Sequence, residues 1–440
     1  MVNNAVAGLG FAPDIPKVIF PIEMFLVESD ISGVEKSFMQ FAEGLTSWSP
    51  PPQTKAMKKL PRIKVEGEDY EAAYHNFNAL YTKRRWSDGL PLVPPTEKRV
   101  AWILEGTDES PELEIGKFGP RGGIVTMETL AVALAMAGGR PEYLPVLDAA
   151  VRAIFQPVFN HSGWQATSSS TVPAVVVNGP VARQIRINHG FGLVGPDPKN
   201  PAGGVIGRAI RLLQQNVGGA LPGIGTMAMF GMMRYTNAVF AEDEEGLPSG
   251  WEPFNTERFG YAPGTNSVAV NVCSSASNII RRGIGTETLQ FEAEASLRRL
   301  ASYMSAININ CSYAWRDGTP GILVMSRPIA RQLAGIGWTK KSIQEFLWKH
   351  ARIPVAELES AGVPDWLKRV DINPPYEDPW PVTSKPENIA IVVAGGFHPT
   401  HNMWMQTSIS PQVVHEAVKL PKKWDELVKK GEAELGYDTK

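Results

Sequence analysis

Three histidines and one glutamate are the side chains in this sequence best suited to acid–base chemistry. His161 precedes an apolar run at residues 172–177, His189 lies in a glycine-dense stretch after that run, and His401 follows a Gly-Gly pair. Glu242 opens an acidic run after another apolar segment. Imidazole titrates near neutrality and carboxylates exchange protons, so we predict these four residues as catalytic acids and bases.

Polar side chains around the same apolar run could hold a substrate. Hydroxyl and amide groups come before it and an Asn-Gly-Pro turn follows it, so we expect residues 160–219 to form one wall of a cleft. The alternative is that these groups only satisfy the backbone of turns, as Ser, Thr and Asn often do. The predicted substrate-binding residues are Gln165, Thr167, Ser168, Asn178, Arg208 and Trp404.

A second histidine near the C-terminus raises a metal alternative. His398 and His401 are three residues apart, and two neutral imidazoles with a carboxylate could bind one divalent metal ion. Pro399 disfavours a regular helix carrying them, so a catalytic histidine in a glycine-shaped loop is an equally good interpretation. No other cofactor is predicted.

The glycines and the acidic residues that follow the apolar runs each have a functional and a purely structural interpretation. A helix that begins behind Gly203 and Gly204 presents free N–H groups to an anion, with Arg208 nearby. The spacing matches neither a Walker loop nor a dinucleotide fingerprint, so a shaped structural loop is the stronger interpretation. The acidic run at residues 242–245 is usual for a solvated loop, which is the stronger interpretation there as well.

Alternating apolar runs and amphipathic segments predict an α/β fold. The run at residues 172–177 is continuously apolar, which is typical of a strand covered on both faces in a parallel or mixed sheet. Further strands are predicted at residues 235–240, 267–272, 322–325 and 389–393. Helices are predicted at residues 32–45, 68–85, 96–104, 126–137, 143–154, 203–217, 286–307 and 343–350. Thr96 and Thr339 are candidate N-caps for the helices at 96–104 and 343–350.

A short internal sequence repeat suggests that the chain contains two related halves. Residues 175–184 and 323–332 both read as strand, turn and then Pro-Val/Ile-Ala-Arg-Gln. We therefore predict two similar strand-turn-helix halves with mostly parallel or mixed sheets and a cleft between them. The predicted organisation is an N-terminal partner-docking arm at 1–46, a Pro- and Lys-rich linker at 47–67, and halves at 68–265 and 266–440.

Composition excludes several classes of partner. The 440 residues are 43% hydrophobic and 20% charged with a formal net charge of −2, so nothing favours nucleic acid or an anionic membrane. With only two cysteines, Cys273 and Cys311, a disulfide framework is not expected. No signal-like segment and no bilayer-length apolar run is visible, so the expected location is the cytoplasm.

Several strings resemble an uncharacterised bacterial family that accompanies, or is fused to, UGSC-type (seleno)proteins, which are similar to glycine-reductase selenoprotein B. Residues 8–21 resemble the tail that follows the thiol or selenol domain in that family. The redox motif itself is absent. The other matching strings span most of residues 68–405 and are WSDGLPLVPPT (86–96), GRPEYLPV (139–146), GWQAT (163–167), VNGP (177–180), IGRA (206–209), NVGG (216–219), AEDEE (241–245), HARIP (350–354) and VVAGG (392–396).

The resemblance implies a partner as well as a substrate. A separate small subunit would carry the Cys-x-x-Cys or Sec-x-x-Cys motif, giving a hetero-oligomer. The leading hypothesis is an enzyme, or the large subunit of a two-component lyase or reductase, acting on a small organic substrate, with an anionic one as an option. The alternatives are a metal-dependent hydrolase or lyase using His398, His401 and a carboxylate, and a non-catalytic partner subunit.

Overall fold

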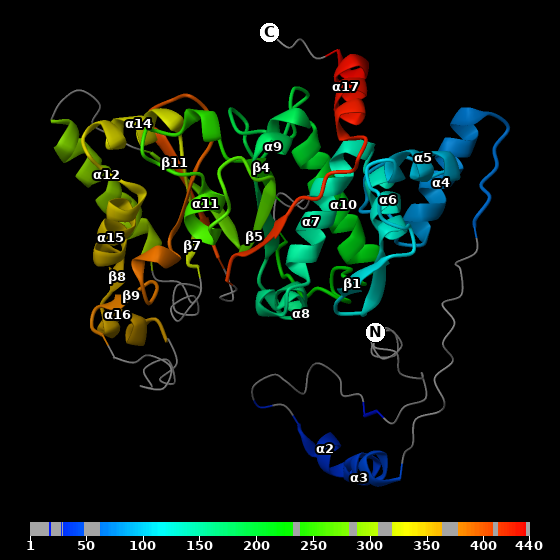
Figure 1. Cartoon of the computed structure of the whole chain (residues 1–440). Helices are drawn as coiled ribbons and strands as arrows, with labels where there is room; N and C mark the ends of the chain where they lie inside the picture. Colours follow the sequence, from blue (N-terminus) through cyan, green and yellow to red (C-terminus); the bar gives the residue numbers. More distant parts are fainter. Residues whose placement is uncertain are drawn as a thin grey trace.

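The chain folds into helices and mixed parallel and antiparallel sheets, so the predicted α/β class is confirmed (Figure 1). This computed structural model describes residues 17–18, 28, 30–47, 62–231, 238–280, 288–306, 319–362, 377–407 and 412–436. Much of the predicted arm and linker, and the expected strand start at 235–237, lie outside these residues, as does Cys311.

The first four-stranded sheet has the order β12-β5-β3-β4. Its centre is β3 (Val172–Asn178), which is parallel to β4 (Ala238–Ala241) and antiparallel to β5 (Ser267–Cys273). The outer strand β12 (Val414–Ala417) is antiparallel to β5. Every residue of β3 is buried, as the continuous apolar run predicted.

The second four-stranded sheet repeats this arrangement with the order β10-β7-β11-β6. Its central strand β7 (Gly321–Met325) is parallel to β10 (Ala390–Val393) and antiparallel to β11 (His401–Gln406). The outer strand β6 (Ser275–Ile280) is antiparallel to β11. Strands β6, β11 and β12 carry polar side chains, and the sequence patterns did not predict them.

The two sheets are therefore related element by element, which confirms the two similar halves. The echoed Pro-Val/Ile-Ala-Arg-Gln segments form α9 (Pro180–Gln184) after β3 and α14 (Arg327–Gly335) after β7. The halves exchange strands, however. β5 continues through Ser274 into β6 of the other sheet, and β11 leads towards β12 of the first. A boundary at residues 265/266 consequently does not separate the sheets.

The molecule has four layers, with the sheets inside and helices outside (Figure 1). Alternation along β3 shows why: Val175 and Val177 pack in the core beneath the helices, whereas Ala174 and Val176 face the other sheet. The facing surfaces share one apolar core that includes Ile322, Val324, Ala390, Val392 and Met405. Side chains thus fill the space between the sheets where a cleft was expected.

Helices cover the outer face of each sheet. Over the first sheet lie α6 (Met127–Met136), α7 (Leu144–Ile154) and α10 (Ala202–Asn216), and α4 (Tyr70–Lys83) and α5 (Glu97–Leu104) extend this layer. Over the second lie α12 (Leu289–Met304), α14 and α15 (Lys340–His350). The predicted caps Thr96 and Thr339 both accept a hydrogen bond from the first turn of their helices.

Shorter elements complete the described chain. They are the hairpin β1 (Glu114–Phe118) and β2 (Gly123–Thr126), the pair β8 (Arg352–Ile353) and β9 (Trp380–Pro381), and the helices α8 (His161–Ala166), α11 (Phe254–Phe259), α16 (Val355–Ser360) and α17 (Trp424–Leu435). In the arm, α2 (Ser32–Lys36) and α3 (Phe38–Thr46) bury no residue. None of the helices in the described ranges is long and apolar enough to span a bilayer.

Candidate functional site

The residues predicted to form one cleft wall lie at opposite ends of β3. His161, Gln165, Thr167 and Ser168 precede the strand, whereas Asn178 closes it. Seven extended residues span about 20 Å. Residues before and after the strand therefore belong to two different environments, an amino end and a carboxyl end.

At the amino end, His161 is a buried aromatic-core residue. It begins the short helix α8, and its ring packs edge-on against Phe118, Phe155 and Trp164. Burial lowers the pKa of His161 from its ordinary value to about 3. The imidazole is consequently neutral at physiological pH and does not exchange protons there.

Three buried polar atoms on α8 have no hydrogen-bond partner: Nε2 of His161, Nε1 of Trp164 and Oε1 of Gln165. The neighbouring hydroxyl of Thr167 accepts from the backbone N–H of Ser169 at 3.1 Å. This contact is the turn-stabilising role that had been the alternative for such residues. The amino end is thus polar in sequence but poor in polar contacts.

At the carboxyl end, Glu242 lies at the junction of the two sheets with its side chain fully buried. Its Oε2 accepts hydrogen bonds from Nδ2 of Asn178 at 2.7 Å and from the backbone N–H of Phe254 at 2.6 Å. The buried ammonium of Lys340 is 3.5 Å from Oε1. Burial raises the pKa of Glu242, and Lys340 is the strongest influence that opposes the rise.

Asp243, the next residue, forms a salt-bridge network across the halves. Its 1% exposed side chain lies 2.6 Å from Nε of Arg327 on α14 and 3.3 Å from Nη2 of Arg183 on α9. Its backbone N–H donates to the carbonyl of Val393, at the end of β10, at 2.8 Å. Asp243 thus ties the carboxyl ends of β4 and β10 together.

Glu244 completes this region, which we call the carboxyl-edge cluster. Its Oε1 accepts from Nδ2 of Asn178 at 2.9 Å and from the backbone N–H of Gly179 at 2.6 Å. The acidic run is therefore not a solvated loop, although Glu245 remains exposed. The members of the cluster are Asn178, Arg183, Glu242, Asp243, Glu244, Arg327 and Lys340.

His189 joins the same end of the molecule. Its carbonyl accepts from the backbone N–H of Gly395 at 2.9 Å, so the glycine stretch after β3 contacts the Gly-Gly turn after β10. The rings of Phe191 and Phe397 stack edge-on beside this contact. Burial lowers the pKa of His189, while the charge of Asp243 acts in the opposite direction.

The segment at residues 395–401, which we call the histidine loop, holds two exposed imidazoles around one hydroxyl. Oγ1 of Thr400 is 2.5 Å from Nδ1 of His398 and 2.6 Å from Nδ1 of His401. Ser326 donates to the carbonyl of His398 at 3.0 Å. His401 also begins β11, so the sheet positions one end of this loop.

This geometry sets the protonation pattern of the histidine pair. A hydroxyl has one proton, so Thr400 can donate to only one Nδ1 and must accept a proton from the other. In the neutral pair, one imidazole therefore presents an unprotonated Nε2 and the other presents Nε2–H. A base and an acid are thereby available side by side.

The metal alternative needs a third ligand beside the two histidines. Within the ranges that the structure describes, no group of three or more His, Cys, Asp or Glu residues is arranged to hold a metal ion. The ring centroids of His398 and His401 are 6.2 Å apart, and both Nδ1 atoms face Thr400.

Two other predicted substrate-binding residues, Arg208 and Trp404, have structural roles. Arg208 on α10 donates to both carboxylate oxygens of Asp88, at 2.8 and 2.9 Å, so its guanidinium is not free to hold an anion. Trp404 on β11 is 1% exposed and packs in the core beneath α12 and α14.

Sequence reasoning missed several residues of the carboxyl end. Arg183 and Arg327 lie within the similar segments at residues 175–184 and 323–332, which had been used only as evidence for duplication. Thr400 stands between the two histidines, and that spacing was the available signal for a bridging hydroxyl. Lys340 follows the predicted cap Thr339, and nothing local distinguishes it from a surface lysine.

Comparisons with known proteins leave the family open. The chain matches no protein-family model, no curated protein sequence and no solved structure. The geometry of the carboxyl end is therefore the basis for a functional assignment.

Proposed function

We propose that this chain is an enzyme, or the large subunit of one, that uses the histidine loop for acid–base chemistry on a small organic molecule. The observation that carries the proposal is the Thr400 hydroxyl, which lies within hydrogen-bond distance of Nδ1 of both His398 and His401. Acid–base catalysis needs one group that accepts a proton and one that donates it.

The Thr400 hydroxyl also offers a route by which the two histidines exchange their acid and base roles. When one imidazole takes a proton at Nε2, it becomes a cation with protons on both nitrogens. The cation then gives its Nδ1 proton to Oγ1 while the Thr400 hydroxyl gives its own proton to Nδ1 of the other ring, so the positive charge moves to the second imidazole and the hydroxyl afterwards donates to the first. Each histidine can thus serve as acid or base in turn.

The surroundings support a site that is held in place yet reachable. The ring of Phe397 lies 4.7 Å from the guanidinium of Arg327, whose charge is neutralised by Asp243. This contact connects the exposed histidine loop to the buried carboxyl-edge cluster. The cluster acts as scaffold, because its charged groups already bind one another.

The first test determines the tautomers of His398 and His401, a measurement that requires no substrate. In protein labelled with ¹⁵N-histidine, we expect His398 and His401 to show opposite tautomers near pH 8. Thr400→Val should abolish that pattern, because it removes the bridging hydroxyl. Identical tautomers in the unsubstituted protein would contradict the proposal.

Activity is the second readout. Small organic acids, amides and hydroxy compounds would be screened by thermal shift, and turnover of any hit would be measured. We expect His401→Gln to lower kcat by about 10²-fold or more, since positioned acid–base groups contribute that much. His350→Gln, at the partly buried C-terminal end of α15, is the matched control and should retain full activity. Full turnover by His401→Gln would refute a catalytic role.

A non-catalytic partner subunit is the second candidate, and one observation favours it. In the described part of the arm, α2 and α3 expose large apolar side chains, including Phe38 (66%), Met39 (74%) and Leu45 (87%). Such a surface is typical of a docking segment. The proposed partner is the small thiol or selenol subunit, and deletion of residues 1–46 should abolish its co-purification from the native host.

A further inference from the structure

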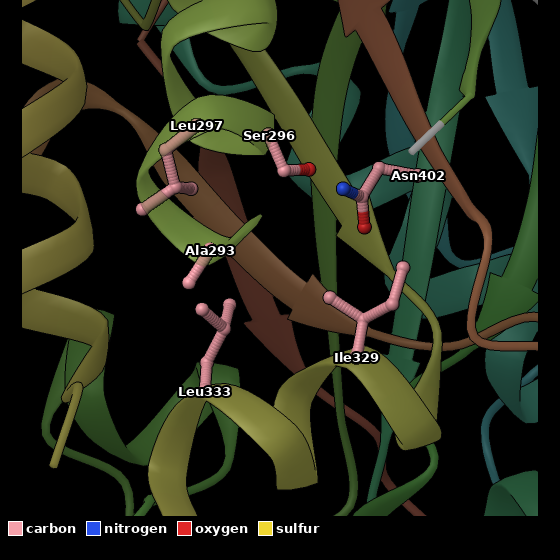
Figure 2. Close-up of a pocket in the computed structure, with 6 residues that line it drawn as sticks. All are labelled: Ala293, Ser296, Leu297, Ile329, Leu333 and Asn402. Carbon is pink, nitrogen blue, oxygen red and sulfur yellow. The ribbon is translucent and has the colours of Figure 1, made fainter. Parts of the chain in front are cut away.

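The outer strand of the second sheet, β6, is paired on one side only. Its neighbour on that side is β11, and no strand in the described ranges pairs with its other side. Helices α12 and α14 pack on the face of this sheet over β11, where Figure 2 shows Leu297 and Ile329 beside Asn402. A free strand edge presents unpaired backbone N–H and C=O groups, so it can take up another strand.

The ladder between β11 and β7 shows which backbone groups of β6 are free. The N–H of Thr407 donates to the carbonyl of Pro320 at 2.9 Å, in register with that ladder. Successive residues of a strand bond alternately to the neighbours on either side, so the preceding residue, Gln406, bonds to Ser275 of β6. The residues of β6 whose backbone groups point away from β11 are then Ala276, Asn278 and Ile280. All three are exposed, and within the described ranges no hydrogen bond from outside the sheet reaches them.

The first sheet protects the corresponding edge. Its outer strand β12 is the counterpart of β6, because each pairs antiparallel with the strand beside the central one. β12 carries the charged residue Glu416, and Gln156 donates to the carbonyl of His415 at 2.7 Å. β6, in contrast, reads Ser-Ala-Ser-Asn-Ile-Ile, with no charge and no proline. Charges and prolines are common means of preventing edge pairing, so β6 is open to a partner strand.

The sequence of β6 complements itself. When two copies of β6 pair antiparallel about a two-fold axis at Asn278, this residue lies opposite its own copy and Ala276 lies opposite Ile280. An amide both donates and accepts hydrogen bonds, so Asn278 is compatible with itself. The small Ala276 leaves room for the larger Ile280, and no like charges meet. An identical strand is therefore a fitting occupant of this edge.

We propose that β6 pairs with β6 of a second copy of this chain, so that the second sheets of two protomers form one sheet across a two-fold axis. The free groups of Ala276, Asn278 and Ile280 supply the backbone hydrogen bonds of this interface. Tyr303 of α12, which contacts the hydroxyl of Ser277 and is 40% exposed, adds apolar area beside the strand. The association needs none of the acid–base chemistry proposed for the histidine loop, so either proposal can fail without the other.

Charges at the two-fold axis test the pairing. Asn278→Lys and Asn278→Glu each place two like charges opposite one another, so either variant alone should dissociate about tenfold more readily than the unsubstituted dimer. An equal mixture of the two variants should restore the dimer, because lysine then faces glutamate. Sedimentation velocity of the full chain measures each state. Ala417→Lys, at the exposed end of β12, is the matched control and should leave association unchanged.

A cysteine at the same position locates the axis. The Cα atoms of an opposed, hydrogen-bonded pair lie about 5.5 Å apart, within reach of a disulfide. With Cys311→Ser in the background, buried Cys273 is the only other cysteine. Mild oxidation should then link two chains of Asn278→Cys but not of Ala417→Cys.

Three outcomes would overturn the proposal. The first is an unsubstituted protein that stays monomeric at every concentration. The second is a dimer that Asn278→Lys leaves intact, since the interface would then lie elsewhere. The third is a mixture of the Lys and Glu variants that stays monomeric, because two copies of β6 would then not face each other at Asn278.

Discussion

The two ends of β3 are both buried and polar, yet they are built in opposite ways. At the amino end, His161 lies among aromatic rings and its Nε2 has no partner. At the carboxyl end, Glu242 has Asn178, Lys340 and the backbone N–H of Phe254 around it. Burial favours the neutral form of both groups, because it lowers the pKa of His161 and raises the pKa of Glu242.

The difference shows what a buried polar group contributes. His161 is surrounded by apolar side chains, so protonation of its ring lowers the stability of the folded protein. Its Nε2 makes no hydrogen bond to the neighbouring half. The carboxyl-edge cluster instead connects strands and helices of both halves through hydrogen bonds. We therefore expect substitutions at the carboxyl end to destabilise the protein and substitutions at the amino end to be neutral or stabilising.

The largest expected effect is at Asp243. Asp243→Ala leaves Arg327 and Arg183 without their shared carboxylate and removes a contact between the halves. Breaking a buried ion pair costs about 3 kcal/mol or more, and the partial exposure of both arginines places this case at the lower limit. Urea denaturation would measure the loss. The exposed neighbour Glu245→Gln is the control, with an expected change below about 0.5 kcal/mol. Equal effects of the two substitutions would remove the distinction between buried and exposed acids.

A second effect, at His161, depends on pH. The folded-state pKa of His161 is lowered to about 3, so the unfolded chain binds a proton near pH 6.5 that the folded chain does not. The stability that the neutral ring provides is present above pH 6.5 and is lost as the pH falls. Between pH 7 and pH 5 the protein should lose about 2 kcal/mol relative to His161→Phe. Parallel stability curves for the two proteins over this range would show that His161 is not buried in its neutral form.

The smallest expected effect compares the two ends directly. Gln165→Met removes a buried acceptor that has no partner and should stabilise the protein by about 1 kcal/mol. Asn178→Leu removes a donor shared by Glu242 and Glu244 and should destabilise it by a similar amount or more. Thermal unfolding of both variants shows whether each substitution raises or lowers the stability of the protein. A loss of stability in Gln165→Met would mean that the amino end has polar contacts after all.

Local patterns were sufficient for the apolar strands and most helices. β3, β5, β7 and β10 each coincide with a predicted apolar run to within a residue or two at either end, because fully buried strands need continuous apolar sequence. β11 was missed: it begins with His401 and Asn402, and its strand character depends on pairing with β7 and β6. Pairing between distant segments leaves little local trace.

The candidate site was predicted only in part for a related reason. Asn178, His189, Glu242 and the histidine loop do gather at one end of the molecule, since the carboxyl ends of parallel strands share an edge. His161 and Gln165 were assigned to the same cleft because they are close in sequence. A strand separates its two ends by its full length, so closeness in sequence did not mean closeness in space.

By itself, the sequence determined the α/β class, the apolar strands, the helix caps and the duplication, because each of these follows from local pattern and burial. The tertiary structure decided that the halves exchange strands, that their sheets pack face to face, and that Asp243 meets Arg183 and Arg327. It also decided which histidines are buried and which surround Thr400. Those outcomes depend on contacts between residues far apart in the chain, and no local preference specifies them.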